Sequence, residues 1–348
     1  MFRVALSGDF RRADGAPAYP MFDLAPLTTT KGVEYAFVDA LDGVMQAKDL
    51  ADFDALILLG ARFDARSLPP GGRLLAVARF GVGYDNVDVP ACTQAGVALV
   101  ITPDGVRRPV AVSVLTFILA LAGKLMVKDR LTREGPSGWA KRSDHMGMGL
   151  TGRTLGQFGI GNIGAEVFRV AAPLGMRFIA HDPFVSAEQA RALGVELVDV
   201  DTLFRQSDFL SISVPLSDAT RGIVGKRLIG LMKPTAYLIN TARGPVVDQN
   251  ALTQALEAGT IAGAGLDVFE VEPTPADERL LALDNVIVTP HALCWTDECF
   301  AGNGASDVAA VLALARGAEP RGIVNRDVVS DPRFVARLAQ LRQSGGPG

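Results

Sequence analysis

The sequence contains little cysteine and little histidine, with three residues of each among 348. The cysteines, Cys92, Cys294 and Cys299, are odd in number and follow no repeated spacing, which argues against a disulfide framework. His291 and Cys294 also lack two further ligands at a recognisable spacing, so no metal site is expected. We therefore expect free thiols in a reducing cytoplasm.

An excess of basic charge and a long hydrophobic run are also missing. The net charge is −4 and the pI is about 5.5, which gives no electrostatic reason to expect nucleic acid or an anionic membrane as a partner. The longest apolar stretch, residues 110–122, includes Ser113 and Thr116 and is shorter than a membrane span. The first residues resemble a strand more than a signal peptide.

Short apolar runs alternate with segments of helical spacing along most of the chain, which predicts an α/β fold. Eleven runs are predicted as strands: residues 2–6, 33–38, 55–59, 74–78, 98–101, 154–158, 196–198, 209–214, 236–240, 263–267 and 286–289. A further apolar run covers residues 176–180. Four segments are predicted as helices: residues 163–174, 218–232, 248–258 and 297–316.

A glycine-rich turn, Gly159-Ile-Gly161-Asn162-Ile163-Gly164, lies between the predicted strand 154–158 and the predicted helix 163–174. At such a turn the backbone can approach a pyrophosphate, whose charge is stabilised by the N–H groups and dipole of the helix. Asp182 follows at the distance where a carboxylate would bind the adenosine ribose and repel a 2′-phosphate. We call these six residues the fingerprint, and together with Asp182 they predict NAD as the cofactor.

The fingerprint is not N-terminal, since five predicted strands precede it. The simplest organisation is a doubly wound dinucleotide-binding domain, residues 125–293, inserted into a second α/β domain built from residues 1–124 and 294–340. Residues 341–348 are predicted to form a disordered polar tail.

Four further motifs appear in order: residues 79–88 (RFGVGYDNVD), 240–244 (NTARG), 265–273 (GLDVFEVEP) and 289–292 (TPHA). With the fingerprint, they resemble the D-2-hydroxyacid dehydrogenases over residues 50–328, most closely phosphoglycerate dehydrogenases and glyoxylate or hydroxypyruvate reductases. The resemblance implies two Rossmann-like domains, the outer one a flavodoxin-like substrate domain. It also implies an NAD-dependent oxidoreductase of small D-2-hydroxy acids that forms a homodimer, with an exchanged arm at residues 127–150 around Trp139.

Three residues match the catalytic set of this family. His291 suits transfer of the hydroxyl proton because imidazole changes its charge near neutral pH. Glu272 would orient the imidazole and favour its charged form, with Glu270 as its rival. Arg243 would bind the substrate carboxylate at two points, although a salt bridge within the cofactor domain is the alternative.

The resemblance also assigns binding residues. Asp267 matches the acid that holds the nicotinamide carboxamide. Val214 and Pro215 match residues beside the adenine, while Thr241 and Ala242 match the edge of the nicotinamide pocket. The backbone of Val82 and Gly83 matches the segment that binds the substrate carboxylate, and Arg79 is either an anion contact or a structural ion pair.

The chain departs from the family near the predicted pocket. Val112 and Val114 replace polar residues, and Trp295 either narrows the substrate pocket or packs at a hinge. Arg107 and Arg108 stand where relatives have small or neutral residues, and they are either solvated or bind a second anionic group.

A different class of function stays open at this point. Some proteins that resemble this family, the C-terminal-binding corepressors, use the nucleotide-bound fold chiefly as a binding module. The presence of Arg243, Glu272 and His291 together favours an enzyme over such a nucleotide-sensing module.

Overall fold

The computed structural model describes residues 1–343. The chain forms two compact units: an outer unit of Met1–Val106 with the chain from Thr296 onward, and an inner unit, Arg107–Trp295. The division falls at residues 107 and 295, compared with 125 and 293 expected from the sequence. Residues 341–343 were expected to be disordered but belong to helix α13, and residues 344–348 of the expected tail lie outside the described residues.

The outer unit contains a five-stranded parallel sheet in the order β2-β1-β3-β4-β5. This order is that of flavodoxin-like folds. The strands are β1 Phe2–Ser7, β2 Val33–Val38, β3 Ala55–Leu58, β4 Ala76–Arg79 and β5 Ala98–Ile101. The helices are α1 Ala25–Thr29, α2 Ala47–Leu50, α3 Val89–Ala95, α12 Asp297–Ala315 and α13 Pro332–Gln343.

The inner unit contains a seven-stranded parallel sheet in the order β12-β11-β10-β9-β6-β7-β8. The strands are β6 Thr154–Phe158, β7 Arg177–His181, β8 Glu196–Leu197, β9 Phe209–Ile212, β10 Tyr237–Asn240, β11 Gly263–Leu266 and β12 Val286–Val288. The chain winds outward from β6 in both directions, which is the doubly wound arrangement of dinucleotide-binding domains. All eleven predicted strands and the α/β fold class are confirmed, and the apolar run at residues 176–180 corresponds to β7.

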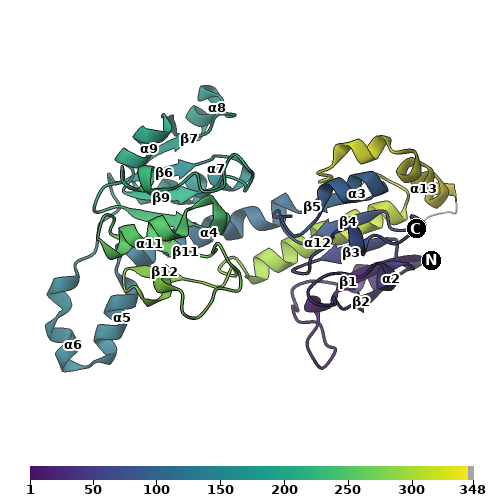
Figure 1. The fold of residues 1–348 in the computed structure, drawn as a ribbon, viewed down its shortest axis with the longest axis horizontal. Coiled ribbons are helices and arrows are strands. Elements are labelled where there is room, and N and C mark those ends of the chain that lie inside the picture. Colours follow the sequence, from purple (N-terminus) through teal and green to yellow (C-terminus); the bar gives the residue numbers. More distant parts are fainter. Residues whose placement is uncertain (344–348) are drawn as a thin grey trace. The chain divides into compact units, whose positions relative to one another are not determined.

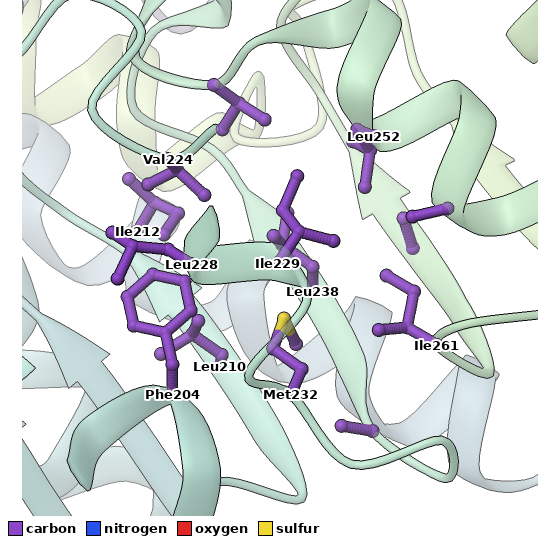
Figure 2. Packing of buried hydrophobic residues seen from close by; sticks show 14 of the residues in the cluster. Phe204, Leu210, Ile212, Val224, Leu228, Ile229, Met232, Leu238, Leu252 and Ile261 are labelled. Carbon is purple, nitrogen blue, oxygen red and sulfur yellow. The ribbon is translucent and has the colours of Figure 1, made fainter. Parts of the chain in front are cut away.

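The strands were predictable because both faces of each sheet are covered, so their sequences are almost continuously apolar. Figure 2 shows one face of the inner sheet, where Leu210, Ile212 and Leu238 meet side chains from the covering helices, including Phe204 and Leu252. The helices on this face are α9 Val200–Gln206, α10 Lys226–Ile229 and α11 Gln249–Glu257.

Helix α4, Pro103–Ala122, supplies much of the core on the opposite face. Its residues Ala111, Phe117 and Ile118 pack with Val167 and Phe168 of α7. With 20 residues, α4 is longer than the apolar stretch 110–122 and is long and apolar enough to cross a membrane. However, 61% of its most apolar 18-residue segment is buried inside the protein. This packing also explains why the inner unit begins at residue 107 and not near 125.

The predicted helix over residues 218–232 is wrong. This segment contains turns and only the short helix α10. Gly222 has a positive φ of 62°, which a right-handed helix does not allow. The N–H of Val224 donates to the carbonyl of Val246, so it does not form a helical hydrogen bond. The other predicted helices are confirmed as α7 Asn162–Ala171, which continues as a short 3-10 turn, α11 and α12.

Two helices of the inner unit, α5 Leu125–Arg133 and α6 Pro136–Ala140, extend away from its sheet (Figure 1). They carry exposed apolar side chains at Leu125, Met126 and Trp139. The helix α8, Ala187–Ala192, completes the inner unit.

Candidate functional site

The predicted cofactor and catalytic residues of the inner unit follow the carboxyl ends of neighbouring strands. In a parallel sheet these ends share one edge, and ligands of doubly wound sheets bind there, where the winding direction changes. From one side of the sheet to the other, the edge carries His291 after β12, Asp267 after β11, Arg243 after β10, Val214 after β9, the fingerprint turn after β6 and Asp182 after β7.

Each of the three glycines of the fingerprint is required, or tolerated, for a different structural reason. Gly159 has a φ of 89°, which permits the tight turn after β6. A Cβ on Gly164 would lie 2.3 Å from the carbonyl oxygen of Gly159, so α7 can approach the turn only without a side chain. A Cβ on Gly161 would meet nothing within 4 Å, so this position is open for a ligand. The turn therefore fits the pyrophosphate of a dinucleotide.

Asp182 is fixed beside this turn by both of its carboxylate oxygens. Oδ2 accepts a hydrogen bond of 2.9 Å from the N–H of Ile160, and Oδ1 accepts one of 2.9 Å from the N–H of Phe184. These bonds orient the carboxylate at the end of β7, next to the fingerprint. Such a carboxylate can accept hydrogen bonds from ribose hydroxyls and disfavours a phosphate at the same place.

The remaining predicted cofactor residues lie on the same edge. The side chain of Val214 lies against Gly159, where its Cγ1 would be 3.0 Å from an added Cβ. Pro215 follows it, and its carbonyl accepts the hydroxyl of Thr220 at 2.6 Å. Thr241 and Ala242 follow β10, where the N–H of Ala242 donates to Asn240 at 3.0 Å.

His291 and Glu272 are in direct contact. Nδ1 of His291 lies 2.8 Å from Oε2 of Glu272, and Oε1 of Glu272 accepts the N–H of Phe269 at 2.8 Å. Both side chains are partly exposed. The contact fixes the ring orientation and leaves Nε2 as the nitrogen that can reach a substrate.

Arg243 is the third residue of the predicted catalytic set, and its positive charge acts on Glu272. Burial raises the pKa of Glu272, but the hydrogen bond from His291, the His291 charge, the Phe269 N–H and the Arg243 charge together outweigh burial and lower this pKa below its ordinary value. Glu272 is therefore ionised near neutral pH. Nη1 of Arg243 donates to the carbonyl of Ala242 at 2.6 Å, which holds the guanidinium close to the end of β10.

Asp267 anchors the segment that carries His291. Its buried carboxylate accepts the hydroxyl of Thr289 at 2.6 Å and the N–H groups of Ala292 and Leu293 at 3.0 and 3.2 Å. Burial raises the pKa of Asp267 despite these hydrogen bonds. The anchoring matters because His291 has a positive φ of 53°, a conformation that non-glycine residues adopt only when their surroundings impose it.

A hollow of about 610 Å³ borders the catalytic pair. Glu272 and His291 lie on its wall, beside the apolar side chains of Phe269, Leu281 and Val288.

The outer unit contains the other predicted substrate residues. Arg79, at the end of β4, donates to Oδ1 of Asn86 at 3.3 Å and to the carbonyl of Phe80. Val82 and Gly83 follow in a loop that is fixed through Gly81, whose N–H donates to Oγ1 of Thr102 at 2.8 Å.

Trp295 and the arginine pair belong to the inner unit. The side chain of Trp295 is 47% exposed, and the backbone N–H of Trp295 donates to the carbonyl of Ala292 at 2.9 Å. Arg108 forms an ion pair with Glu166 at 2.8 Å, and Nη1 of Arg107 donates to Oδ1 of Asn162 at 3.3 Å.

Sequence reasoning did not single out Thr289, Glu166 or Asp307. Thr289 stood in a recognised motif but had no assigned role. Glu166 lies four residues after Asn162, at helical spacing on the fingerprint helix, and that spacing could have suggested a partner for the arginine pair. No sequence signal points to Asp307, whose burial depends on how α12 packs.

The fold and the site together define a dinucleotide-binding α/β enzyme with a histidine–glutamate pair. Residues 115–292 match the family model for the NAD-binding domain of D-isomer specific 2-hydroxyacid dehydrogenases. The chain therefore belongs to the D-isomer specific 2-hydroxyacid dehydrogenase family, as its motifs predict.

Relatives with assigned names agree with this membership. The chain is 41% identical over 283 residues to a glyoxylate reductase of Korarchaeum cryptofilum, covering 80% of this chain and 84% of that one. It is 36% identical over 302 residues to a D-3-phosphoglycerate dehydrogenase of Archaeoglobus fulgidus, covering 86% of this chain but only 57% of that one. A solved glyoxylate reductase structure from Paecilomyes thermophila has a TM-score of 0.78 at 27% identity and covers 93% of this chain and 98% of that one.

These relatives are enzymes that act on hydroxy acids, and nothing in the comparisons supports the alternative of a binding module. The protein is an NAD-dependent oxidoreductase that transfers hydride between the nicotinamide and C2 of a 2-hydroxy or 2-oxo acid.

Proposed function

We propose that this enzyme reduces a small, unphosphorylated 2-oxo acid of the glyoxylate or hydroxypyruvate type to the D-2-hydroxy acid. The contact of 2.8 Å between His291 and Glu272 carries the proposal, because it provides a proton donor beside an anion that stabilises its charged form. Glyoxylate reductases among the relatives support the choice of substrate.

His291 is the proposed acid. Bound NADH supplies the hydride for C2 of the substrate. Nε2 of His291 donates a proton to the 2-oxo oxygen, while Nδ1 keeps its hydrogen bond to Glu272. In the oxidation direction the same nitrogen removes the hydroxyl proton.

Arg243 is the proposed ligand of the substrate carboxylate. A guanidinium can donate two parallel hydrogen bonds to a carboxylate and polarise the neighbouring 2-oxo group. From the outer unit, the proposed substrate domain, we assign the backbone of Val82 and Gly83 and the side chain of Arg79 to the same anion. The proposed role of Trp295 is to limit the size of the group on C2.

For the cofactor, all the assigned residues follow strands at the same edge of the inner sheet. Asp182 takes the adenosine ribose, and Val214 with Pro215 lies beside the adenine. Gly159, Gly161, Asn162, Ile163 and Gly164 take the pyrophosphate. Thr241, Ala242 and Asp267 take the nicotinamide end.

An unphosphorylated substrate is favoured over phosphohydroxypyruvate by the contacts of the arginine pair. Arg108 is paired with Glu166, and Arg107 contacts Asn162 of the fingerprint. Both contacts are made with residues of α7.

The test is consumption of NADH and NADPH by the purified protein with glyoxylate, hydroxypyruvate, phosphohydroxypyruvate, pyruvate and a bulky 2-oxo acid. We expect NADH-dependent turnover that is highest with glyoxylate or hydroxypyruvate. The His291→Ala variant should lose about 10²-fold to 10⁴-fold in kcat while it still binds NADH. A clear preference for phosphohydroxypyruvate would reject the proposed substrate class, and full activity of His291→Ala would reject the mechanism.

We also propose a cytoplasmic homodimer. The exposed Trp139 and Met146 lie within the expected exchanged arm, residues 127–150, and the exposed Leu125 and Met126 lie directly before it. They support the arm because a patch of exposed apolar side chains can mark a surface that a partner covers. Light scattering of the purified protein should give twice the chain mass of 36.7 kDa, and Trp139→Ser should shift it toward one chain. A wild-type protein with the mass of one chain would exclude the dimer.

A further inference from the structure

Two consecutive arginines of α4 reach the helix that begins at the fingerprint. Arg107 donates from Nη1 to Oδ1 of Asn162 at 3.3 Å, across 55 residues of sequence. Asn162 is the first residue of α7, and Gly161 before it provides no side chain to cap the helix. The guanidinium of Arg107 therefore lies at the start of the helix that faces the cofactor pyrophosphate.

Arg108 contacts a different part of α7. It forms an ion pair with Glu166 at 2.8 Å, and Glu166 also pairs with Arg169 at 3.0 Å. Glu166 is buried, and its hydrogen bond from Arg108 is the main cause that lowers its pKa. Arg108 thus shares a carboxylate with Arg169, and its ion pair fixes the part of α4 that belongs to the inner unit against α7.

We infer that Arg107 binds the pyrophosphate of the dinucleotide, and that Asn162 positions it for this contact. The site for the phosphates is open at Gly161, where an added Cβ would meet nothing within 4 Å. A guanidinium is well suited to phosphate oxygens because it can donate two hydrogen bonds in one plane. Asn162 offers an amide oxygen, which accepts a hydrogen bond from the guanidinium and so orients it.

This assignment extends the cofactor site beyond the glycine motif. Arg107 belongs to α4, which precedes β6 in the chain, so the contact lies outside the glycine motif. The inference assigns Arg107 to the cofactor, and neither to solvent nor to a second anionic group of the substrate.

The experiment measures cofactor binding without turnover. Dissociation constants for NADH, ADP-ribose and adenosine are measured by fluorescence or calorimetry for the wild type, Arg107→Gln and Arg107→Lys. Arg169→Gln is the matched control, because it removes one positive charge from α7 about 10 Å further along the helix. Circular dichroism checks that each variant is folded.

We expect Arg107→Gln to weaken NADH and ADP-ribose by about tenfold, which is an ordinary loss for one charged hydrogen-bonding group. Adenosine, which has no phosphate, should bind as before. Arg107→Lys should recover part of the loss, and the affinity of Arg107→Gln for NADH should depend less on salt than that of the wild type. Arg169→Gln should change no dissociation constant by more than about twofold.

Three results would overturn the inference. If Arg107→Gln bound NADH within twofold of the wild-type affinity, Arg107 would not contact the pyrophosphate. An equal loss for adenosine would indicate a general disturbance of the site. If Arg107→Gln left the NADH affinity unchanged but raised the KM for the 2-oxo acid, Arg107 would bind the substrate and not the cofactor.

Discussion

Nδ1 of His291 lies 2.8 Å from Oε2 of Glu272, although 19 residues separate them in the sequence. The two residues follow adjacent strands, since Glu272 comes after β11 and His291 after β12. Asp267 joins these two segments as well, through Thr289. The sheet thus brings the pair together, and a buried carboxylate maintains the loop that holds it.

Replacement of Glu272 by Gln should impair proton transfer more than binding. The variant keeps the shape of the side chain but loses the anion that favours the charged imidazole, so kcat for reduction should fall by about 10²-fold. The KM for the 2-oxo acid should change much less than kcat, because Arg243, and not Glu272, is assigned to the substrate carboxylate. Steady-state kinetics between pH 5 and 9 measure both effects.

Glu270→Gln is the control for this variant. Glu270 stands two residues earlier, and Oε1 accepts the N–H of Gln249 at 3.0 Å, away from His291. Its kinetics should resemble those of the wild type. If Glu270→Gln had the larger effect, the assignment of Glu272 would be wrong.

The lowered pKa of Glu272 also makes a contribution to stability that depends on pH. Because the pKa is lower in the folded chain than its ordinary value of 4.5, the carboxylate stabilises the fold above that value. This contribution is lost as pH falls through the lowered pKa. Thermal melts below pH 5 should therefore show a smaller acid loss for Glu272→Gln than for the wild type, and a steeper acid loss for the variant would contradict this sign.

Asp182→Ala should relax the preference for NADH. The substitution removes the carboxylate that repels a 2′-phosphate, so the ratio of kcat/KM for NADPH to that for NADH should rise by about 10²-fold. The backbone N–H groups of Ile160 and Phe184 also lose their acceptor, so NADH itself should bind less tightly. A wild-type enzyme that already prefers NADPH would refute the role of Asp182.

Substitution of Gly161 and substitution of Gly164 should have different effects, the first on NADH binding and the second on stability. Gly161→Ala places a methyl group in space that the protein leaves open, so the fold should keep its melting temperature while NADH binding weakens. Gly164→Ala places the methyl group 2.3 Å from a carbonyl oxygen, which should lower the stability by about 1–3 kcal/mol. Thermal melts and NADH titrations of both variants test the distinction, and equal melting temperatures would contradict it.

The sheet and the catalytic motifs could be predicted from the sequence because their signals are local. A strand buried on both faces is a short apolar run, and a glycine turn needs particular residues at fixed spacing. The helix over residues 218–232 could not be judged in this way, since the backbone of Val224 pairs with a segment more than twenty residues away. The unit boundary near residue 107 depends on how α4 packs, and the contact of Arg107 with Asn162 depends on where α4 ends up against α7.

Asp307 provides a prediction for the stability of the outer unit. Its side chain is fully buried in α12, and within residues 1–343 neither carboxylate oxygen has a hydrogen-bond partner. Burial raises the pKa of Asp307 well above its ordinary value, although the charge of Arg79 opposes the shift. The folded chain therefore holds a proton that the unfolded chain releases, and stability falls as pH rises from about 4 toward the raised pKa.

Asp307→Asn removes this titration and keeps the size of the side chain. At pH 7 the variant should be more stable than the wild type by about 1–3 kcal/mol, and the difference should shrink as pH falls toward 4. Thermal melts at pH 5, 6, 7 and 8 measure it, with Asp327→Asn as a control because Asp327 is exposed on the same unit. A lower melting temperature of Asp307→Asn at pH 7 would mean instead that an ionised Asp307 stabilises the fold through its interaction with Arg79.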